Sequence, residues 1–130
     1  MVAAWEFAIT YHAATLAGGI PTLLNPVYRE REVRYQLENS GATFLVTDAP
    51  LLEGINLAGL PCLRRVFTTR HERGGCENFA NLLLPSTATL PKPMQDSAQT
   101  VAALPYSSGT TGLPKGVVLW RWSSTRWWRA

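Results

Sequence analysis

The stretch TVAALPYSSGTTGLPKGVVL, residues 100–119, places a polar, glycine-rich loop between two apolar segments. The flanking segments 100–107 and 116–119 contain the β-branched and apolar residues that favour strands. Glycine, proline and hydroxyl side chains dominate the loop between them, as is typical of a tight connection. The sequence therefore predicts a strand, a loop and a returning strand.

The loop has the chemistry needed to hold an anion. Its glycines allow close backbone approaches that a Cβ would prevent, and Pro114 limits the freedom of the turn. Successive N–H groups can form an anion-binding nest, and the hydroxyls and the ammonium of Lys115 suit a polyphosphate. A Walker loop is excluded because, counted from Gly109, its second glycine position is occupied by Pro114.

Upstream of the loop, helical and strand patterns alternate. Residues 1–17 predict a helix that stops at Gly18, and residues 30–40 predict an amphipathic helix ended by Gly41. The segments predicted as strands are short and apolar: 20–24, 42–48 and 63–69. This alternation predicts an α/β fold with a mainly parallel sheet whose crossovers supply the flanking helices. One or two helical turns are expected at 79–84, and a surface connection at 85–99.

Composition indicates a folded chain, since 46% of the 130 residues are hydrophobic and 16% are charged. The net charge of +3 arises entirely from three arginines in residues 120–130, because residues 1–119 have equal numbers of acidic and basic side chains. Two cysteines are too few for a disulfide framework or a zinc cluster. No apolar run approaches the roughly 20 residues of a membrane span, and no signal peptide is evident. We expect a soluble, cytoplasmic chain.

The last residues, WRWSSTRWWRA at 120–130, differ from the rest of the chain because they contain four of the five tryptophans. A basic aromatic segment can bind single-stranded nucleic acid or lie on an anionic membrane. The simpler interpretation is noncoding-like sequence or an aggregation hazard, so no nucleic-acid partner is expected. We therefore divide the chain into residues 1–119 and an atypical tail at 120–130.

The string YSSGTTGLPKGVVL closely resembles the phosphate-binding signature of the acyl-adenylate-forming superfamily, which includes acyl-CoA synthetases, coumarate-CoA ligases, beetle luciferases and peptide-synthetase adenylation domains. Residues 16–48, LAGGIPTLLNPVYREREVRYQLENSGATFLVTD, also resemble this superfamily. The sequence of these two segments is most similar to the coumarate-CoA and aryl or fatty acyl-CoA ligase branch. The resemblance implies that residues 1–119 are part of an N-terminal AMP-binding domain.

The resemblance also implies a two-step reaction. ATP, with Mg²⁺, activates a carboxylic acid as acyl-AMP, and coenzyme A then takes the acyl group as a thioester. By residue match, the groups that would cradle the β- and γ-phosphates are Ser107, Ser108, Gly109, Thr110, Thr111, Gly112 and Lys115. The match assigns no catalytic residue and no metal ligand.

The chain departs from the superfamily after residue 119. Members continue with a Thr-His or Ser-His pair where this chain has Trp120 and Arg121. The adenine and acyl pockets and the C-terminal catalytic lysine would lie beyond residue 130, and Lys115 cannot take that lysine's role. We expect a fragment that is inactive alone, from a shifted reading frame, a misjoined exon or a truncated gene model. The alternatives are a residual nucleotide-binding module and a noncatalytic interaction protein.

The histidines and cysteines have simpler interpretations. His12 is expected to be a packing or surface residue because no nucleophile is placed beside it. His71, within the charged string RHER, is expected in a solvated loop. Cys62 and Cys76 are interpreted as ordinary thiols.

Overall fold

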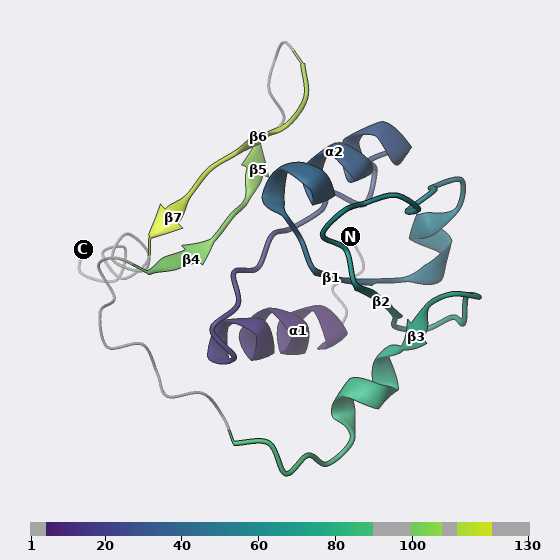
Figure 1. The fold of residues 1–130 in the computed structure, drawn as a ribbon, viewed down its shortest axis with the longest axis vertical. Helices are drawn as coiled ribbons and strands as arrows, with labels where there is room; N and C mark the ends of the chain where they lie inside the picture. The colour runs from purple at the N-terminus through teal and green to yellow at the C-terminus, as the bar shows by residue number, and fades with distance from the viewer. Residues whose placement is uncertain (1–4, 90–99, 108–111, 121–130) are drawn as a thin grey trace. The chain divides into compact units, whose positions relative to one another are not determined.

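A computed structural model of the chain describes residues 5–89, 100–107 and 112–120. Residues Met1–Leu23 and Ala88–Ala130 form unit 1, and residues Leu24–Thr87 form unit 2. Unit 1 contains the glycine-rich hairpin, and unit 2 contains a parallel sheet (Figure 1). No helix in the described ranges has the length and apolar character needed to cross a membrane.

The sheet of unit 2 has three strands: β1 (Phe44–Thr47), β2 (Arg65–Thr68) and β3 (Glu77–Asn78). Their order is β1-β2-β3 and both pairings are parallel, which confirms the predicted α/β class with a mainly parallel sheet. The sequence did not predict β3, because its two residues, Glu77 and Asn78, have low strand propensity.

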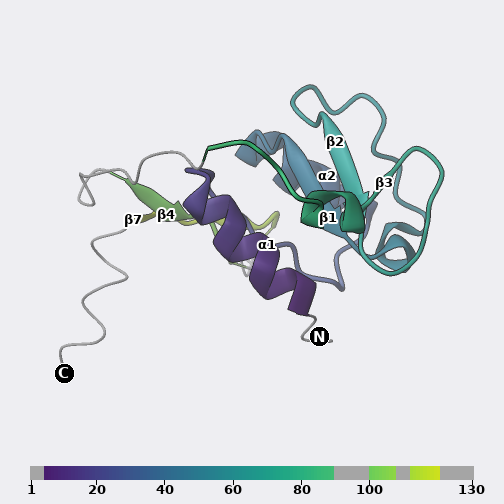
Figure 2. The ribbon, with the colours of Figure 1, turned by 90° about the horizontal axis from the view of Figure 1, so that it is seen from below.

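Helix α2 (Glu30–Ser40) packs on one face of this sheet (Figure 2). Val33 and Leu37 lie one turn apart, are only 6% and 3% exposed, and join a core cluster with Leu45 of β1. Burial of each such side chain contributes about 1.5–3 kcal/mol. Glu32 accepts a hydrogen bond from the Arg29 N–H at 3.1 Å at the start of the helix. Gly41 ends it in the left-handed conformation, as predicted.

The crossover from β1 to β2 differs from expectation. It contains only the 3₁₀ turn η1 (Ala49–Leu52) and irregular chain, so the crossovers within this sheet do not supply α-helices. The positive-φ glycines Gly54 and Gly59 interrupt any longer helix, whereas Pro50 lies in the first turn of η1, where proline is tolerated. The connection contributes Leu52, Ile55 and Leu60 to the core instead. The predicted turn at 79–84 is present as η2 (Phe79–Leu83).

In unit 1, helix α1 (Trp5–Leu16) ends before Gly18, which has a positive φ of 81°, as the sequence predicted. The prediction of a buried strand at 20–24 is wrong. Ile20 and Leu23 are 54% and 41% exposed, and the segment has no regular structure. Pro21 lacks the N–H that a strand ladder requires, which explains the difference.

The predicted strand-loop-strand hairpin is present, but each arm is divided. Strands β4 (Val101–Ala103) and β5 (Tyr106–Ser107) form the first arm. Strands β6 (Lys115–Gly116) and β7 (Leu119–Trp120) return alongside it (Figure 1). The first arm is interrupted at Pro105, which cannot donate to the ladder.

Candidate functional site

The residues at the two ends of the glycine-rich loop are held opposite each other. In the antiparallel pairing of β5 with β6, Ser107 is the partner of Lys115 and Tyr106 is the partner of Gly116. Directly opposite residues in such a pair project to the same face, with Cβ atoms roughly 4.5–5.5 Å apart. The Ser107 hydroxyl and the Lys115 ammonium therefore emerge from one face of the hairpin beside the loop.

Both side chains are accessible to a ligand. Ser107 and Lys115 are exposed, and the Lys115 ammonium forms no ion pair or hydrogen bond with another described residue. An ammonium without an anionic partner, next to a hydroxyl donor, suits a phosphate oxygen. No group of three or more His, Cys, Asp or Glu side chains that could hold a metal ion is found in the part of the chain that the structure describes.

Tyr106 and Gly116 occupy the next register position and fix the spacing of the arms. An ideal Cβ placed on Gly116 would lie 3.1 Å from Cζ of the Tyr106 ring, so the ring lies directly against the glycine backbone. The neighbouring Val117 N–H donates to the Pro105 carbonyl at 2.8 Å and links the two arms again. Gly116 is therefore needed for this close approach and not for a left-handed turn.

Where the first arm is interrupted, the backbone N–H and carbonyl groups form hydrogen bonds with residues outside the hairpin. The Leu104 N–H donates to the Pro21 carbonyl at 2.9 Å, and the Thr22 hydroxyl donates to the Leu104 carbonyl at 2.7 Å. Both backbone groups of Leu104 are thus paired where the β4 and β5 ladders are interrupted. The segment after α1 therefore supports the hairpin at its midpoint.

The structure describes only part of the predicted phosphate cradle. Ser107 and Lys115 are brought together, and Gly112 is exposed, with no atom within 4 Å of an added Cβ. The predicted cradle residues that lie outside the described residues are Ser108, Gly109, Thr110 and Thr111. The sequence reasoning missed the supporting role of Thr22, for which no local pattern gives a signal because 82 positions separate it from Leu104.

His12 is exposed and contacts the Tyr11 ring edge-on at 5.6 Å, which confirms its interpretation as a packing or surface residue. His71 is 63% exposed, but its Nδ1 also lies 3.0 Å from Oδ1 of Asp48. Hydrogen bonding to His71 lowers the pKa of Asp48 from its ordinary value. This pairing could have been anticipated, because the two residues follow adjacent parallel strands. Cys62 and Cys76 are free thiols.

Residues 1–121 match the family model described as AMP-binding enzyme. The chain therefore belongs to the AMP-binding enzyme family, and the resemblance to the adenylate-forming ligases is confirmed. Among its relatives are 4-coumarate-CoA ligase 5 of Oryza sativa subsp. japonica, 39% identical over 115 residues, and 4-coumarate-CoA ligase 3 of Arabidopsis thaliana, 34% identical over 115 residues.

Each of these matches covers 88% of the chain but only 21% and 20% of the respective relative, so the chain spans about one fifth of their length. Solved structures likewise match most of this chain over only a small part of their own length. An anthranilate-CoA ligase in complex with anthranoyl-AMP aligns with a TM-score of 0.75 and 26% identity, over 91% of this chain and 23% of that one. A long-chain-fatty-acid-CoA ligase from Archaeoglobus fulgidus aligns with a TM-score of 0.75 and 27% identity, over the same shares.

Proposed function

We propose that the hairpin binds the triphosphate of ATP as the phosphate-binding part of a ligase that converts a carboxylic acid to acyl-AMP and then to a coenzyme A thioester. The observation that carries this proposal is the pairing of Ser107 with Lys115, which places on one face a hydroxyl and an ammonium that pairs with no described residue. Membership of the AMP-binding enzyme family supports the reaction class.

The residues present fit a polyphosphate. Lys115 would neutralise charge on the β- and γ-phosphates while Ser107 donates a hydrogen bond, and the open space at Gly112 lets an anion approach the backbone. The hydroxyls and amides of Ser108, Gly109, Thr110 and Thr111 complete the proposed cradle. These groups would orient the phosphates and offset their charge as pyrophosphate leaves. ATP itself supplies the adenylate that activates the acid.

We assign no residue of this chain to Mg²⁺ or coenzyme A. Magnesium prefers oxygen ligands and is bound largely through substrate phosphates, so the bound triphosphate would carry it to the site. The relatives named for 4-coumarate make an aromatic carboxylic acid the first substrate to test. We propose that residues 1–119 act as part of the AMP-binding domain in the cytoplasm, with residues 120–130 as a separate tail.

Calorimetric titration of Mg-ATP into the full chain tests the phosphate site. Replacing Lys115 with alanine removes a charge-assisted contact worth about 1.5–3 kcal/mol, so binding should weaken roughly 10- to 150-fold. Arg31→Ala is the matched control, because Arg31 is an exposed cation of α2 whose guanidinium makes no hydrogen bond or ion pair with another described residue. The control should bind ATP within about twofold of the parent chain.

The same titration separates the candidate functions. If Lys115→Ala and Arg31→Ala weakened ATP binding equally, the loss of affinity would come from the change in net charge. That result would contradict a phosphate site at Lys115. Binding of ATP without thioester formation from ATP, coenzyme A and 4-coumarate is the result that we expect for the chain alone, and it corresponds to a nucleotide-binding module. Turnover by the chain would contradict that expectation and make it a ligase in its own right.

A further inference from the structure

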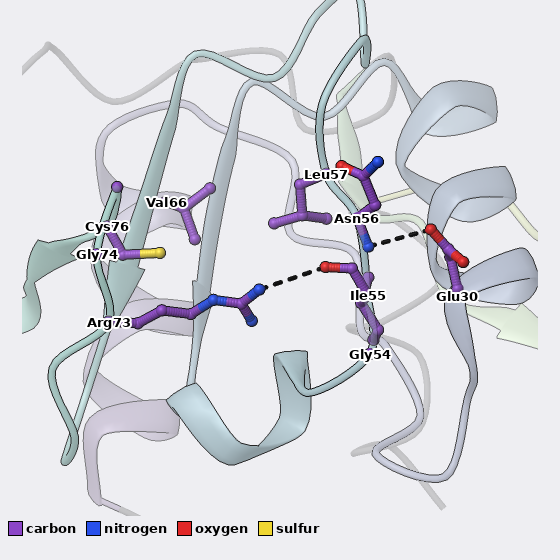
Figure 3. Close-up of a pocket in the computed structure, with 10 residues that line it drawn as sticks. Glu30, Gly54, Ile55, Asn56, Leu57, Val66, Arg73, Gly74 and Cys76 are labelled. Atoms are coloured by element: carbon purple, nitrogen blue, oxygen red, sulfur yellow. Dashed lines mark hydrogen bonds between the residues drawn. The ribbon is translucent and has the colours of Figure 1, made fainter.

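Unit 2 contains a cavity of about 700 Å³ whose lining residues all belong to that unit. It opens between the chain that follows η1 and the segment that precedes β3 (Figure 3). Gly54, Ile55 and Leu57 line one side, Arg73 and Cys76 line the other, and Val66 of β2 lies between them. The cavity is open to solvent, and its volume lies within the roughly 300–1,000 Å³ that is typical of sites for small molecules.

Arg73 brings a positive charge to this cavity. Its side chain extends across the opening toward Ile55 (Figure 3). Nη1 donates to the Leu52 carbonyl at 2.6 Å and Nη2 to the Ile55 carbonyl at 3.4 Å. A guanidinium has five N–H groups, so three of those of Arg73 make no hydrogen bond with another described residue. No carboxylate of a described residue pairs with Arg73, which leaves its charge without an anion.

The other lining groups limit what the anion can be. Leu57, Val66 and Cys76 offer apolar contacts beside the guanidinium. Glu30 also lines the cavity, where its Oε1 accepts a hydrogen bond from the Asn56 N–H at 3.1 Å. The Glu30 carboxylate repels multiply charged ligands such as phosphate esters more strongly than singly charged ones. A guanidinium also matches the planar geometry of a carboxylate through two parallel N–H···O bonds.

We propose that this cavity binds a small monocarboxylate with an apolar body. The carboxylate pairs with Arg73, and the apolar body lies against Leu57 and Val66. The site is independent of ATP binding at the hairpin, so Lys115→Ala should leave it unchanged. A result that contradicts carboxylate binding in the cavity therefore does not contradict ATP binding at the hairpin, and the reverse also holds.

The two thiols of the chain provide a direct readout. Cys76 lines the cavity, whereas Cys62 is exposed and lies outside it. Alkylation of the full chain by iodoacetamide, followed by mass spectrometry of each cysteine, measures occupancy at Cys76 with Cys62 as the internal reference. Benzoate and hexanoate should slow alkylation of Cys76 in a saturable manner and leave Cys62 unchanged. The uncharged probes benzyl alcohol and hexanol should protect at least tenfold less effectively at equal concentration.

Substitution at Gly74 tests the charge without removing Arg73. An added Cβ at Gly74 has no atom within 4 Å and its φ is not positive, so a side chain is tolerated there. Gly74→Asp places a competing carboxylate at the cavity wall and should raise the benzoate concentration for half protection at least tenfold. The asparagine side chain of Gly74→Asn has nearly the same shape as aspartate without its charge. This variant should change the benzoate concentration for half protection less than twofold.

Three results would overturn the proposal. The first is no protection of Cys76 by either carboxylate in the parent chain, including the case in which both cysteines react at the rate of an unfolded peptide. The second is equal protection by the acids and the alcohols, which would show that charge is not recognised. The third is an equal effect of Gly74→Asp and Gly74→Asn.

Discussion

Replacing Thr22 with valine should loosen the hairpin that holds Ser107 and Lys115, although Thr22 is distant from them in sequence. The substitution keeps the shape of the side chain and removes the hydroxyl that donates to the Leu104 carbonyl at 2.7 Å. This bond lies where the ladder between the two arms is interrupted. Of the two hydrogen bonds that the segment after α1 makes with Leu104, only the one from the Leu104 N–H to the Pro21 carbonyl would then remain.

The expected magnitude follows from the environment of that bond. A typical intramolecular hydrogen bond contributes about 0.5–1.5 kcal/mol, and an unsatisfied buried carbonyl costs about 1–3 kcal/mol. Because the Thr22–Leu104 bond is only partly buried, water can reach the orphaned carbonyl in part, and we expect a loss of about 1–2 kcal/mol. This loss corresponds to roughly 5- to 30-fold more frequent local opening of the hairpin.

Native-state hydrogen exchange measures this opening at individual amides. The Leu104 amide, bonded to the Pro21 carbonyl, and the Val117 amide, bonded to the Pro105 carbonyl, should both exchange faster in Thr22→Val. The Val33 amide of α2, bonded to the Arg29 carbonyl, serves as the reference in unit 2. Thr22→Ser keeps the hydroxyl and should exchange within about threefold of the parent. Unchanged exchange at Leu104 and Val117 in the valine variant would refute this account of how the hairpin is supported.

Three further outcomes test the packing and the electrostatics. Leu37→Ala, at a core position 3% exposed, should lower the free energy of unfolding by about 2–5 kcal/mol in urea denaturation, whereas Val27→Ala, at a position 74% exposed, should change it by less than about 0.5 kcal/mol. Gly116→Ala crowds the Tyr106 ring and should lower the thermal midpoint more than Gly112→Ala, whose added methyl meets open space; equal midpoints would contradict the close approach. Hydrogen bonding from Arg65 holds the pKa of Glu77 below its ordinary value of 4.5, so the ion pair contributes stability above that value and loses it as pH falls through the lower pKa of the folded state. NMR titration of Arg65→Gln should return the Glu77 pKa toward 4.5, and an unchanged pKa would assign the shift to another cause.

Features fixed by neighbouring residues were predictable from the sequence. The four-residue spacing of Val33 and Leu37 and the left-handed position at Gly41 define α2 within a single stretch. The prediction of a strand at residues 20–24 failed. The apolar residues of this segment indicate burial, but Pro21 prevents a strand ladder, and composition alone does not show which of these two effects is stronger. The two-residue strand β3 is held by pairing with β2, which is a tertiary contact that propensity does not contain.

The hairpin shows why a motif can indicate a ligand without specifying how firmly the site is held. The paired residues Ser107 and Lys115 lie within one short stretch of the sequence, so this part of the signal is local. Its support comes from Thr22, 82 positions before Leu104, and from the ring of Tyr106 against Gly116. A chain with the same loop but valine at position 22 would retain every side chain that we propose to bind phosphate and lose part of their preorganisation. Because affinity depends on preorganisation as well as on contacts, such a chain should bind a polyphosphate more weakly than this one.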